Sequence, residues 1–324
     1  MPCARTLTLG LLLFVSLPAL ATPRPASTYT VKDLTPTFWR FWDEARAKPE
    51  AEQLRLLRER VIAAHPDVYT AEVLTLDTSR PFDEALATRW PRFLSFAGAH
   101  LDTARTLSAS LKQDLPRYEA RFRKTFPDLA YTGEVYFLAS IGAFDGGTRE
   151  VKGRTALLFG VDVIATIYGE KANLEAFFDH ELFHIYHGQF PDPELEDTLA
   201  RALWKEGLAT YVAWSLNPET PESVLFSLPV DMPERARASM PRLAGELRAR
   251  LDSKSREDYQ NFFLGNPQRE DIPARSGYYV GYVVARELGR TRSLPELARL
   301  RGKPLRDAID GVLRQLESAA PAKP

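Results

Sequence analysis

Cysteine is almost absent from this sequence, since Cys3 is the only one among 324 residues. Disulfides are therefore excluded as a source of stability, which must come from core packing or from a bound metal. An excess of basic residues is also lacking, because 42 Lys and Arg residues accompany 43 Asp and Glu residues. Without a basic run or surface the chain lacks the charge that phosphate recognition requires, and we expect no nucleic-acid partner.

Long apolar runs are missing except at the N-terminus, where residues 7–20 follow Arg5. A basic residue, a short apolar run and the small-residue site Ala19-Leu20-Ala21 are typical of a secretory signal peptide. The alternative is a buried core helix. We expect residues 1–21 to be removed by cleavage after Ala21 and the protein to be exported, to the periplasm or beyond. No later run of about twenty apolar residues provides a membrane anchor.

Residues 36–127 have the spacing of helices, with apolar side chains three and four residues apart. The helices are expected to begin and end at prolines, namely Pro49 and Pro81 at starts and Pro66 and Pro127 at ends. No fixed-period repeat is present. This pattern predicts an N-terminal helical region over residues 22–130.

The pattern changes at residue 131. Residues 131–142 and 153–165 predict two strands, joined by a turn at Asp145-Gly146-Gly147-Thr148. Helical patterns follow at 173–188, with Asn173 as N-cap, at 195–216, within 217–275, and at 277–290 and 293–317. The fold class is therefore α+β, predominantly helical, with a small mixed β-sheet before the helix at 173–188.

Histidine is scarce, yet three of the five histidines fall at 180, 184 and 187. On a helix His180 and His184 are one turn and about 6 Å apart, which suits two imidazoles that bind one zinc ion. His187 lies about 10 Å from His180 along the axis and is assigned to packing or support. Glu181 has the place of the glutamate that accepts a proton from water on zinc. The alternative is a buried helix whose histidines have ordinary partners.

A third ligand is predicted on the next helix, where Glu206 stands among apolar residues, 22 positions after His184. His180, His184 and Glu206 would make a His₂Glu site with an open position for water. Gly207 and Ala209 would let the two helices approach closely. The alternative is a surface glutamate in a salt bridge.

HELFH followed by WKEGLA resembles the gluzincin metallopeptidases, in which a glutamate on the following helix completes HExxH. The resemblance is closest to a bacterial family of predicted zinc-dependent proteases, formerly classed as a domain of unknown function, and it covers about residues 131–290. It implies a zincin-like metallopeptidase domain over 131–324, a Zn²⁺ cofactor and peptide or protein substrates. It also implies an edge strand beside the metal helix, on which an extended substrate can pair.

Gluzincin aminopeptidases have a tyrosine in Y-x-x-G that stabilises the tetrahedral intermediate, and Tyr278 fits this spacing with Gly281. Tyr282 shares its helical face, and Tyr279 does not. The alternative is an aromatic packing stripe, with Gly277 and Gly281 as helix contacts. Arg275 is a candidate for orienting a substrate carboxylate or carbonyl.

The sequence departs from the aminopeptidase pattern in two places. Lys205 replaces the usual asparagine before the ligand glutamate, and G-x-M-E-N is missing, with residues 144–147 (Phe-Asp-Gly-Gly) in the strand region instead. An endopeptidase or specialised hydrolase is therefore favoured over an aminopeptidase. Acidic partners for the outer nitrogens of the ligand histidines are sought among Asp162, Asp179 and Asp197.

The sequence thus predicts an exported zinc metallopeptidase with His180, His184 and Glu206 as ligands and with Glu181 and Tyr278 as catalytic residues. One alternative is a zinc hydrolase that does not cleave ordinary peptides, such as one acting on cell-wall crosslinks. Another is a catalytically silent metal-binding or assembly protein. Glu181 disfavours the latter, since a structural site needs no base, and such sites are commonly closed by cysteines.

Overall fold

The computed structural model describes residues 29–171, 174–226 and 228–319. The fold is α+β, predominantly helical, with one small mixed sheet among the described residues, which confirms the predicted fold class. The expected signal peptide and the expected N-cap Asn173 lie outside these residues. No helix in the described part of the chain is both long and apolar enough to cross a membrane.

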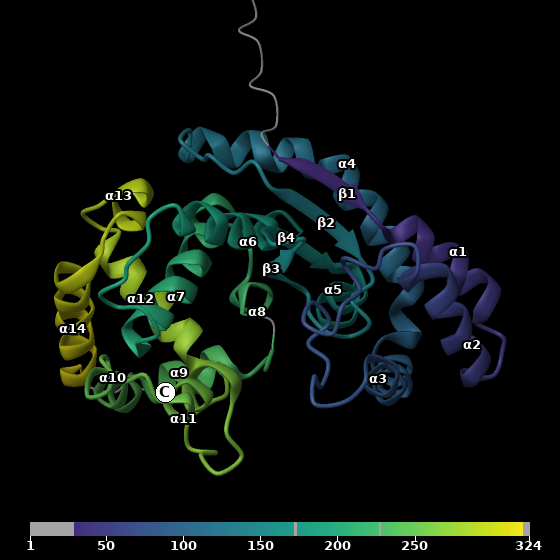
Figure 1. The fold of residues 1–324 in the computed structure, drawn as a ribbon. Helices are drawn as coiled ribbons and strands as arrows, with labels where there is room; N and C mark the ends of the chain where they lie inside the picture. The colour runs from purple at the N-terminus through teal and green to yellow at the C-terminus, as the bar shows by residue number, and fades with distance from the viewer. Residues whose placement is uncertain (1–28, 172–173, 227, 320–324) are drawn as a thin grey trace, which may run out of the picture.

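The sheet has four strands in the order β1-β2-β4-β3 (Figure 1). β1 and β4 pair with β2 in parallel, and β3 pairs with β4 antiparallel. The strand bounds are Thr30–Asp33 for β1, Glu134–Leu138 for β2, Gly146–Val151 for β3 and Arg154–Gly160 for β4. β3 is therefore an edge strand, and it is the strand that follows the loop after β2.

The predicted turn at residues 145–148 is wrong, because Gly146, Gly147 and Thr148 belong to β3 and pair with β4. The chain reverses instead at Lys152 and Gly153, whose φ angles are 54° and 69°. Positive φ at both central residues is the geometry of a tight hairpin turn that matches the twist of the strands. Gly146 and Gly147, which suggested a turn, are therefore part of a β-strand.

The strand predicted over 153–165 ends at Gly160, and the chain continues as α5, Val161–Tyr168. Residues 156–165 form one continuous buried run that spans the end of β4 and the start of α5, and such a run does not distinguish a strand from a helix. A short 3₁₀ turn, Gly169–Lys171, follows α5. β1 was not predicted, since four residues with mostly exposed side chains carry little pattern.

Helices from the first part of the chain pack on one face of the sheet, as Figure 1 shows. Pro49 and Pro81 are N-caps, as predicted. The bounds are Thr35–Ala45 for α1, Glu50–Leu57 for α2 with a π-helical continuation Arg58–Ile62, Phe82–Ala97 for α3, a 3₁₀ turn Gly98–His100, and Leu101–Thr125 for α4. Their core includes Phe38, Trp90 and Phe93 together with Leu158 of the sheet.

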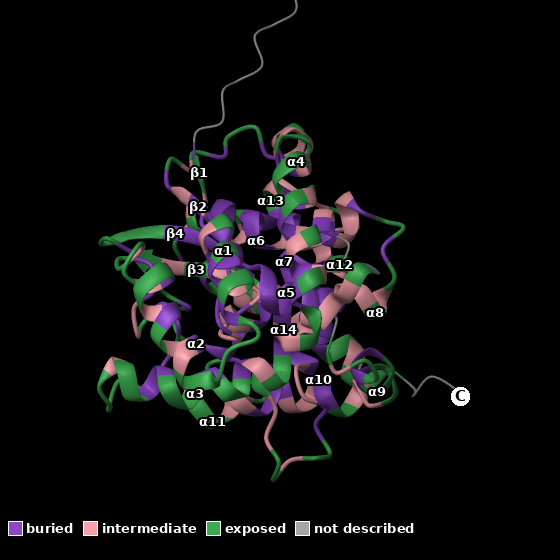
Figure 2. Cartoon of the chain, turned by 90° about the vertical axis from the view of Figure 1, so that its right-hand side faces the viewer, coloured by how far each residue is buried: buried purple, intermediate pink, exposed green. Residues whose placement is uncertain are grey.

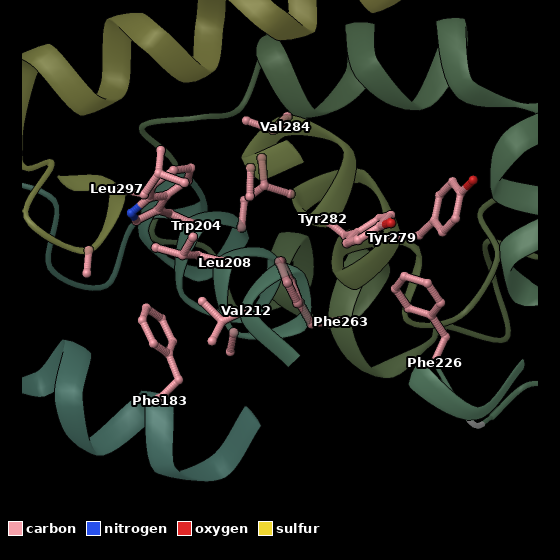
Figure 3. Packing of buried hydrophobic residues seen from close by; sticks show 14 of the residues in the cluster. Phe183, Trp204, Leu208, Val212, Phe226, Phe263, Tyr279, Tyr282, Val284 and Leu297 are labelled. Atoms are coloured by element: carbon pink, nitrogen blue, oxygen red, sulfur yellow. The ribbon is translucent and has the colours of Figure 1, made fainter. Parts of the chain in front are cut away.

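The other face of the sheet is covered by the later helices, which share a second core. The bounds are Leu174–Gly188 for α6, Leu199–Leu216 for α7, Glu222–Leu225 for α8, Met232–Ala238 for α9, Met240–Arg248 for α10, Arg256–Tyr259 for α11 with a π-helical turn Gln260–Leu264, Ser276–Leu288 for α12, Leu294–Ala298 for α13 and Gly302–Ser318 for α14. Figure 3 shows Phe183, Trp204 and Leu208 packed within this core.

The sheet lies between the two cores. On β2, Val135 and Phe137 belong to the core of the later helices, while Tyr136 and Leu138 belong to the other, as the alternation of a strand requires. α4 also contributes to both cores along its length. Figure 2 shows α5, α6 and α7 largely buried and α3 with an exposed face. The division expected at 130/131 stays a prediction, and the sheet combines strands from both sides of it.

Candidate metal centre

Two neighbouring buried helices, α6 and α7, carry the predicted metal ligands. α6 has Phe178, Leu182 and Phe183 fully buried, which holds the helix firmly in the core. α7 begins at Leu199 rather than at the expected residue 195, because Thr198 caps it by accepting a hydrogen bond from the Arg201 backbone N–H at 3.2 Å.

The side chains of His180, His184 and Glu206 meet between the two helices. The two Nε2 atoms are 3.1 Å apart, and Oε2 of Glu206 lies 3.7 Å from Nε2 of His180 and 3.4 Å from Nε2 of His184. All three ligand atoms lie within 4.8 Å of one another. Tetrahedral ligands about 2.0–2.1 Å from zinc stand about 3.3–3.4 Å apart. The group could therefore hold a metal ion, and its spacing fits zinc.

Electrostatics keep the Glu206 carboxylate ionised. Burial alone would raise its pKa, but His184 and His180 outweigh that effect and hold the pKa of Glu206 well below its usual range. For His180, burial lowers the pKa. The hydrogen bond to Glu206 and the charges of Glu181 and Glu206 outweigh burial, so the pKa of His180 is raised. A cation between these side chains would satisfy the same carboxylate without the extra proton.

Glu181 lies beside this group but has different surroundings. Its side chain is buried, with 8% of the residue exposed, and its Oε2 has no hydrogen-bond partner among the described residues. Burial raises the pKa of Glu181, while the two neighbouring histidines lower it less. A carboxyl group with a raised pKa and a free oxygen is suited to taking up and releasing a proton.

The backbone of β3 approaches Glu181 closely. A Cβ atom placed on Gly146 would lie 2.9 Å from Cδ of Glu181 and 2.8 Å from the Phe177 ring, so no larger residue fits there without a shift. The glycine at this position therefore lets the edge strand border the carboxyl group directly.

A cavity of about 340 Å³ is lined by the candidate metal ligands and Glu181. Figure 1 shows that the elements around it, β3, α6, α7 and α12, are distant in sequence and close in space. Its wall includes Asp145 and Arg149 from the β3 region, Lys205 and Thr210 from α7, Phe226 after α8, and Arg275 and Tyr278 from the start of α12. Sequence reasoning missed Arg149, since no motif distinguishes it.

Tyr278 is the one of the three candidate tyrosines that lines this cavity. Burial, together with the charge of Glu206, raises its pKa well above the usual value, so its hydroxyl stays protonated and can donate a hydrogen bond. The Arg275 guanidinium lies 4.5 Å from the centre of its ring. Phe263 packs edge-on against the same ring, with 5.7 Å between ring centres.

Tyr279 and Tyr282 pack elsewhere, although Tyr282 was expected to share the face of Tyr278. Both contact Phe226 and each other in the hydrophobic core, as Figure 3 shows. The predicted packing stripe therefore exists, and Tyr278 stands apart from it at the cavity.

Gly207 makes a close contact, but not the one expected. A Cβ atom on it would collide with the backbone of Gly281, and one on Gly281 would lie 2.9 Å from Cα of Gly207. The glycine pair thus brings α12 against α7, rather than α6 against α7. This crossing sets α12, with Tyr278 near its first turn, beside the helix that carries Glu206.

The expected acidic partners of the ligand histidines are not found among the described residues. Asp162 accepts hydrogen bonds from the loop after β2, and Asp179 pairs with Arg121 and Asn217. Asp197 lies in the loop before α7 with a φ of 61°, and Nδ1 of His184 has no partner. For Asp179 the expectation failed because neighbours in sequence on a helix point to different sides, so that Asp179 faces away from His180 and towards Arg121.

His187 lies outside the metal group, in agreement with its assignment to packing. Its ring stacks on Phe183, with 5.4 Å between centres, and its Nε2 is 3.3 Å from Nη1 of Arg201. It does not line the cavity.

Comparison of the chain with protein-family models, with curated proteins and with solved structures gives no match.

Proposed function

We propose that this protein is an exported zinc-dependent metallopeptidase with a zincin-like core. The observation that supports it most is the meeting of His180, His184 and Glu206 within 4.8 Å, with the unpartnered Oε2 of Glu181 beside them. A zinc ion held by these three side chains would polarise a water molecule and a substrate carbonyl. Glu181 lines the same cavity as the three ligands and would act as the base for such a water.

In this proposal Glu181 transfers the proton and Tyr278 stabilises the negative charge. Oε2 of Glu181 accepts a proton when water adds to the carbonyl and passes it to the leaving nitrogen, which its raised pKa favours. The Tyr278 hydroxyl donates towards the oxygen that becomes negative. The two groups line one cavity, so both can reach one bound amide.

β3 supports a peptide rather than a small molecule as substrate. It is an edge strand, and residues 145–149 form part of the cavity wall. An extended peptide could pair with its backbone, using hydrogen bonds that do not depend on the substrate's side chains.

The test combines metal analysis with cleavage of an unbiased peptide library. We expect about one zinc per chain for protein that begins after residue 21, and cleavage that is lost about 10²–10⁴-fold in Glu181→Gln with zinc retained. Glu206→Ala should weaken zinc affinity by orders of magnitude. Protein that stays metal-free when zinc is supplied would overturn the proposal, and full activity in Glu181→Gln would remove the base assignment.

A further inference from the structure

Arg275 has a backbone conformation that a residue with a long side chain rarely adopts. Its φ and ψ are 63° and 14°, in the left-handed region, immediately before α12. Non-glycine residues in this region are strained, and strain of this kind clusters at functional sites. Here the conformation accompanies a guanidinium that lies over the Tyr278 ring at the cavity wall.

No carboxylate in the described part of the chain pairs with the guanidinium of Arg275. Its Nε is buried without a hydrogen-bond partner, and no acidic side chain of the described residues lies within ion-pair distance. Arg121, by contrast, is paired with both Glu175 and Asp179. A half-buried arginine without an acidic partner is costly unless a ligand supplies one.

The other two cations of the cavity wall already have partners. Arg149 stacks on Phe144 at 4.8 Å, donates from Nη1 to the Thr148 carbonyl oxygen at 2.8 Å, and feels the charges of Glu181 and Asp145. Lys205 is half exposed, with Nζ 4.0 Å from Oε1 of Glu206. Among the described residues, Arg275 is therefore the cation of the cavity wall whose side chain has neither a hydrogen bond nor an ion pair.

The charge of the cavity also favours an anion. Three acidic side chains (Asp145, Glu181 and Glu206) are matched by three basic ones (Arg149, Lys205 and Arg275). A divalent cation at the ligand group would therefore make the occupied site positive. Since a cavity is less screened by water than the open surface, an anionic substrate gains more here than at the surface.

We infer that Arg275 binds a substrate carboxylate, so that the enzyme acts on peptides that carry a carboxylate close to the bond that is cleaved. The planar guanidinium can donate two parallel hydrogen bonds to it, while the Tyr278 ring fixes its plane. The carboxylate can be a free C-terminus or an acidic side chain, which share this chemistry. The inference rests on the proposed function.

Binding of hydroxamates tests Arg275 without a known substrate. The probes are malonic, succinic and glutaric monohydroxamates, each compared by calorimetry on zinc-loaded protein with its counterpart in which the carboxylate is a carboxamide. We expect the best acid to bind at least about tenfold more tightly than its amide. In Arg275→Asn this ratio should fall to about one, since asparagine tolerates the left-handed conformation and leaves the backbone in place.

Two controls separate contact from general charge. Lys205→Gln removes the same charge from the cavity wall and should keep most of the preference for the acid. Arg275→Lys should keep part of it, because the charge remains and the paired donors are lost. Zinc content reports folding, and Arg275→Lys replaces Arg275→Asn if the latter loses zinc.

The outcomes are distinct. Equal binding of acid and amide at every chain length, or an unchanged ratio in the Arg275 variants, would overturn the role of Arg275 while the metal site stands. Equal losses in the Lys205 and Arg275 variants would replace a direct contact by a general field. Failure of every hydroxamate to bind would overturn the proposed function as well.

Peptide libraries then identify the source of the carboxylate. Matched pairs that end in an acid or an amide, and matched pairs with aspartate or asparagine beside each bond, are compared for wild type and Arg275→Asn. Faster cleavage of free C-termini indicates a C-terminal carboxylate, and faster cleavage beside aspartate indicates a side chain. In either case the loss in Arg275→Asn should appear mainly in KM. Equal rates for both members of every pair would contradict the inference.

Discussion

Asp162 on α5 and Glu181 on α6 are both buried carboxyl groups; Asp162 binds the loop that leads into β3, and Glu181 lies beside Gly146, the first residue of β3. Asp162 accepts hydrogen bonds from the backbone N–H of Ser140 at 2.6 Å and of Gly142 at 2.8 Å. Oε2 of Glu181 has no partner among the described residues. Burial raises the pKa of both groups, so burial alone does not distinguish them.

The difference separates support of the fold from chemistry. A buried carboxylate that is fully hydrogen-bonded holds a loop, since each lost bond would leave a backbone donor unsatisfied. An unsatisfied one beside a cavity has free capacity for a ligand. Substitutions that alter either a packed group or a cavity group, and leave the other intact, test this distinction.

The largest effect is expected from Asp162→Ala, which leaves the backbone N–H groups of Ser140 and Gly142 without a hydrogen-bond acceptor. Each unsatisfied buried donor costs about 1–3 kcal/mol, so the free energy of unfolding should fall by about 2–6 kcal/mol. Glu181→Gln should change it by less than about 1 kcal/mol, because no hydrogen bond is lost there. Urea denaturation of the two variants measures both values. Similar losses in both would contradict the distinction drawn here.

Tyr278→Phe should lower turnover about a hundredfold, the effect of removing one hydrogen-bond donor to a developing oxyanion. Tyr282→Phe is the matched control, because Tyr282 lies on the same helix and packs in the core. It should retain turnover within about twofold. Zinc content must be equal in both variants. If Tyr279→Phe or Tyr282→Phe alone reduced turnover, the catalytic tyrosine would be misassigned.

Gly146→Ala should cost about 1–3 kcal/mol of stability, because its Cβ would overlap with Glu181 and Phe177. Cleavage should fall further than the stability loss explains, since the displaced group is the proposed base. Gly98→Ala is the control, where a Cβ meets nothing within 4 Å. Unchanged cleavage in Gly146→Ala would show that β3 moves away without disturbing Glu181.

Local patterns predicted the group of His180, His184 and Glu206 that could hold a metal ion, whereas features that depend on long-range pairing were not predicted. The i,i+4 spacing of His180 and His184 places both side chains on one helical face whatever the fold, so the sequence was sufficient. Glu206 was predicted as the third ligand from its spacing after His184 and from the resemblance of WKEGLA to gluzincins. The acidic partners failed, because Asp162 and Asp179 bind groups from distant parts of the chain, the loop after β2 for Asp162 and Arg121 and Asn217 for Asp179.

The sheet illustrates the same limit. Gly146 and Gly147 carry a turn signal, yet they pair with Phe159 and Leu158 of β4. Strand pairing depends on distant residues, and it overrides the preference of two glycines. Arg149 was missed for a related reason, since its place at the cavity follows from the position of the edge strand. Arg275 was noted as a candidate in the sequence, but its unpaired state is visible only in the structure.

The smallest effect is expected from His187, a packed histidine on α6, the helix that also carries the cavity residues His180, Glu181 and His184. His187 is buried, and burial, with the charge of Arg201, lowers its pKa well below the usual value. The folded protein therefore keeps its ring neutral, while the unfolded chain binds a proton below about pH 6.5. The free energy of unfolding should then decrease as the pH falls below 6.5, by at most about 1.4 kcal/mol per pH unit from this group.

His187→Gln isolates this contribution, since glutamine keeps an acceptor for Arg201 and does not titrate. Urea denaturation at pH 7.5 and 5.5, in the presence of a chelator, gives the free energy of unfolding of both proteins. The decrease on acidification should be smaller in His187→Gln than in wild type, and terms from all other groups cancel in this difference. Exposed His100 provides the control, and His100→Gln should behave as wild type. Parallel curves for His187→Gln and wild type would mean that the folded protein protonates His187, and that it resembles the cavity histidines rather than the packed groups.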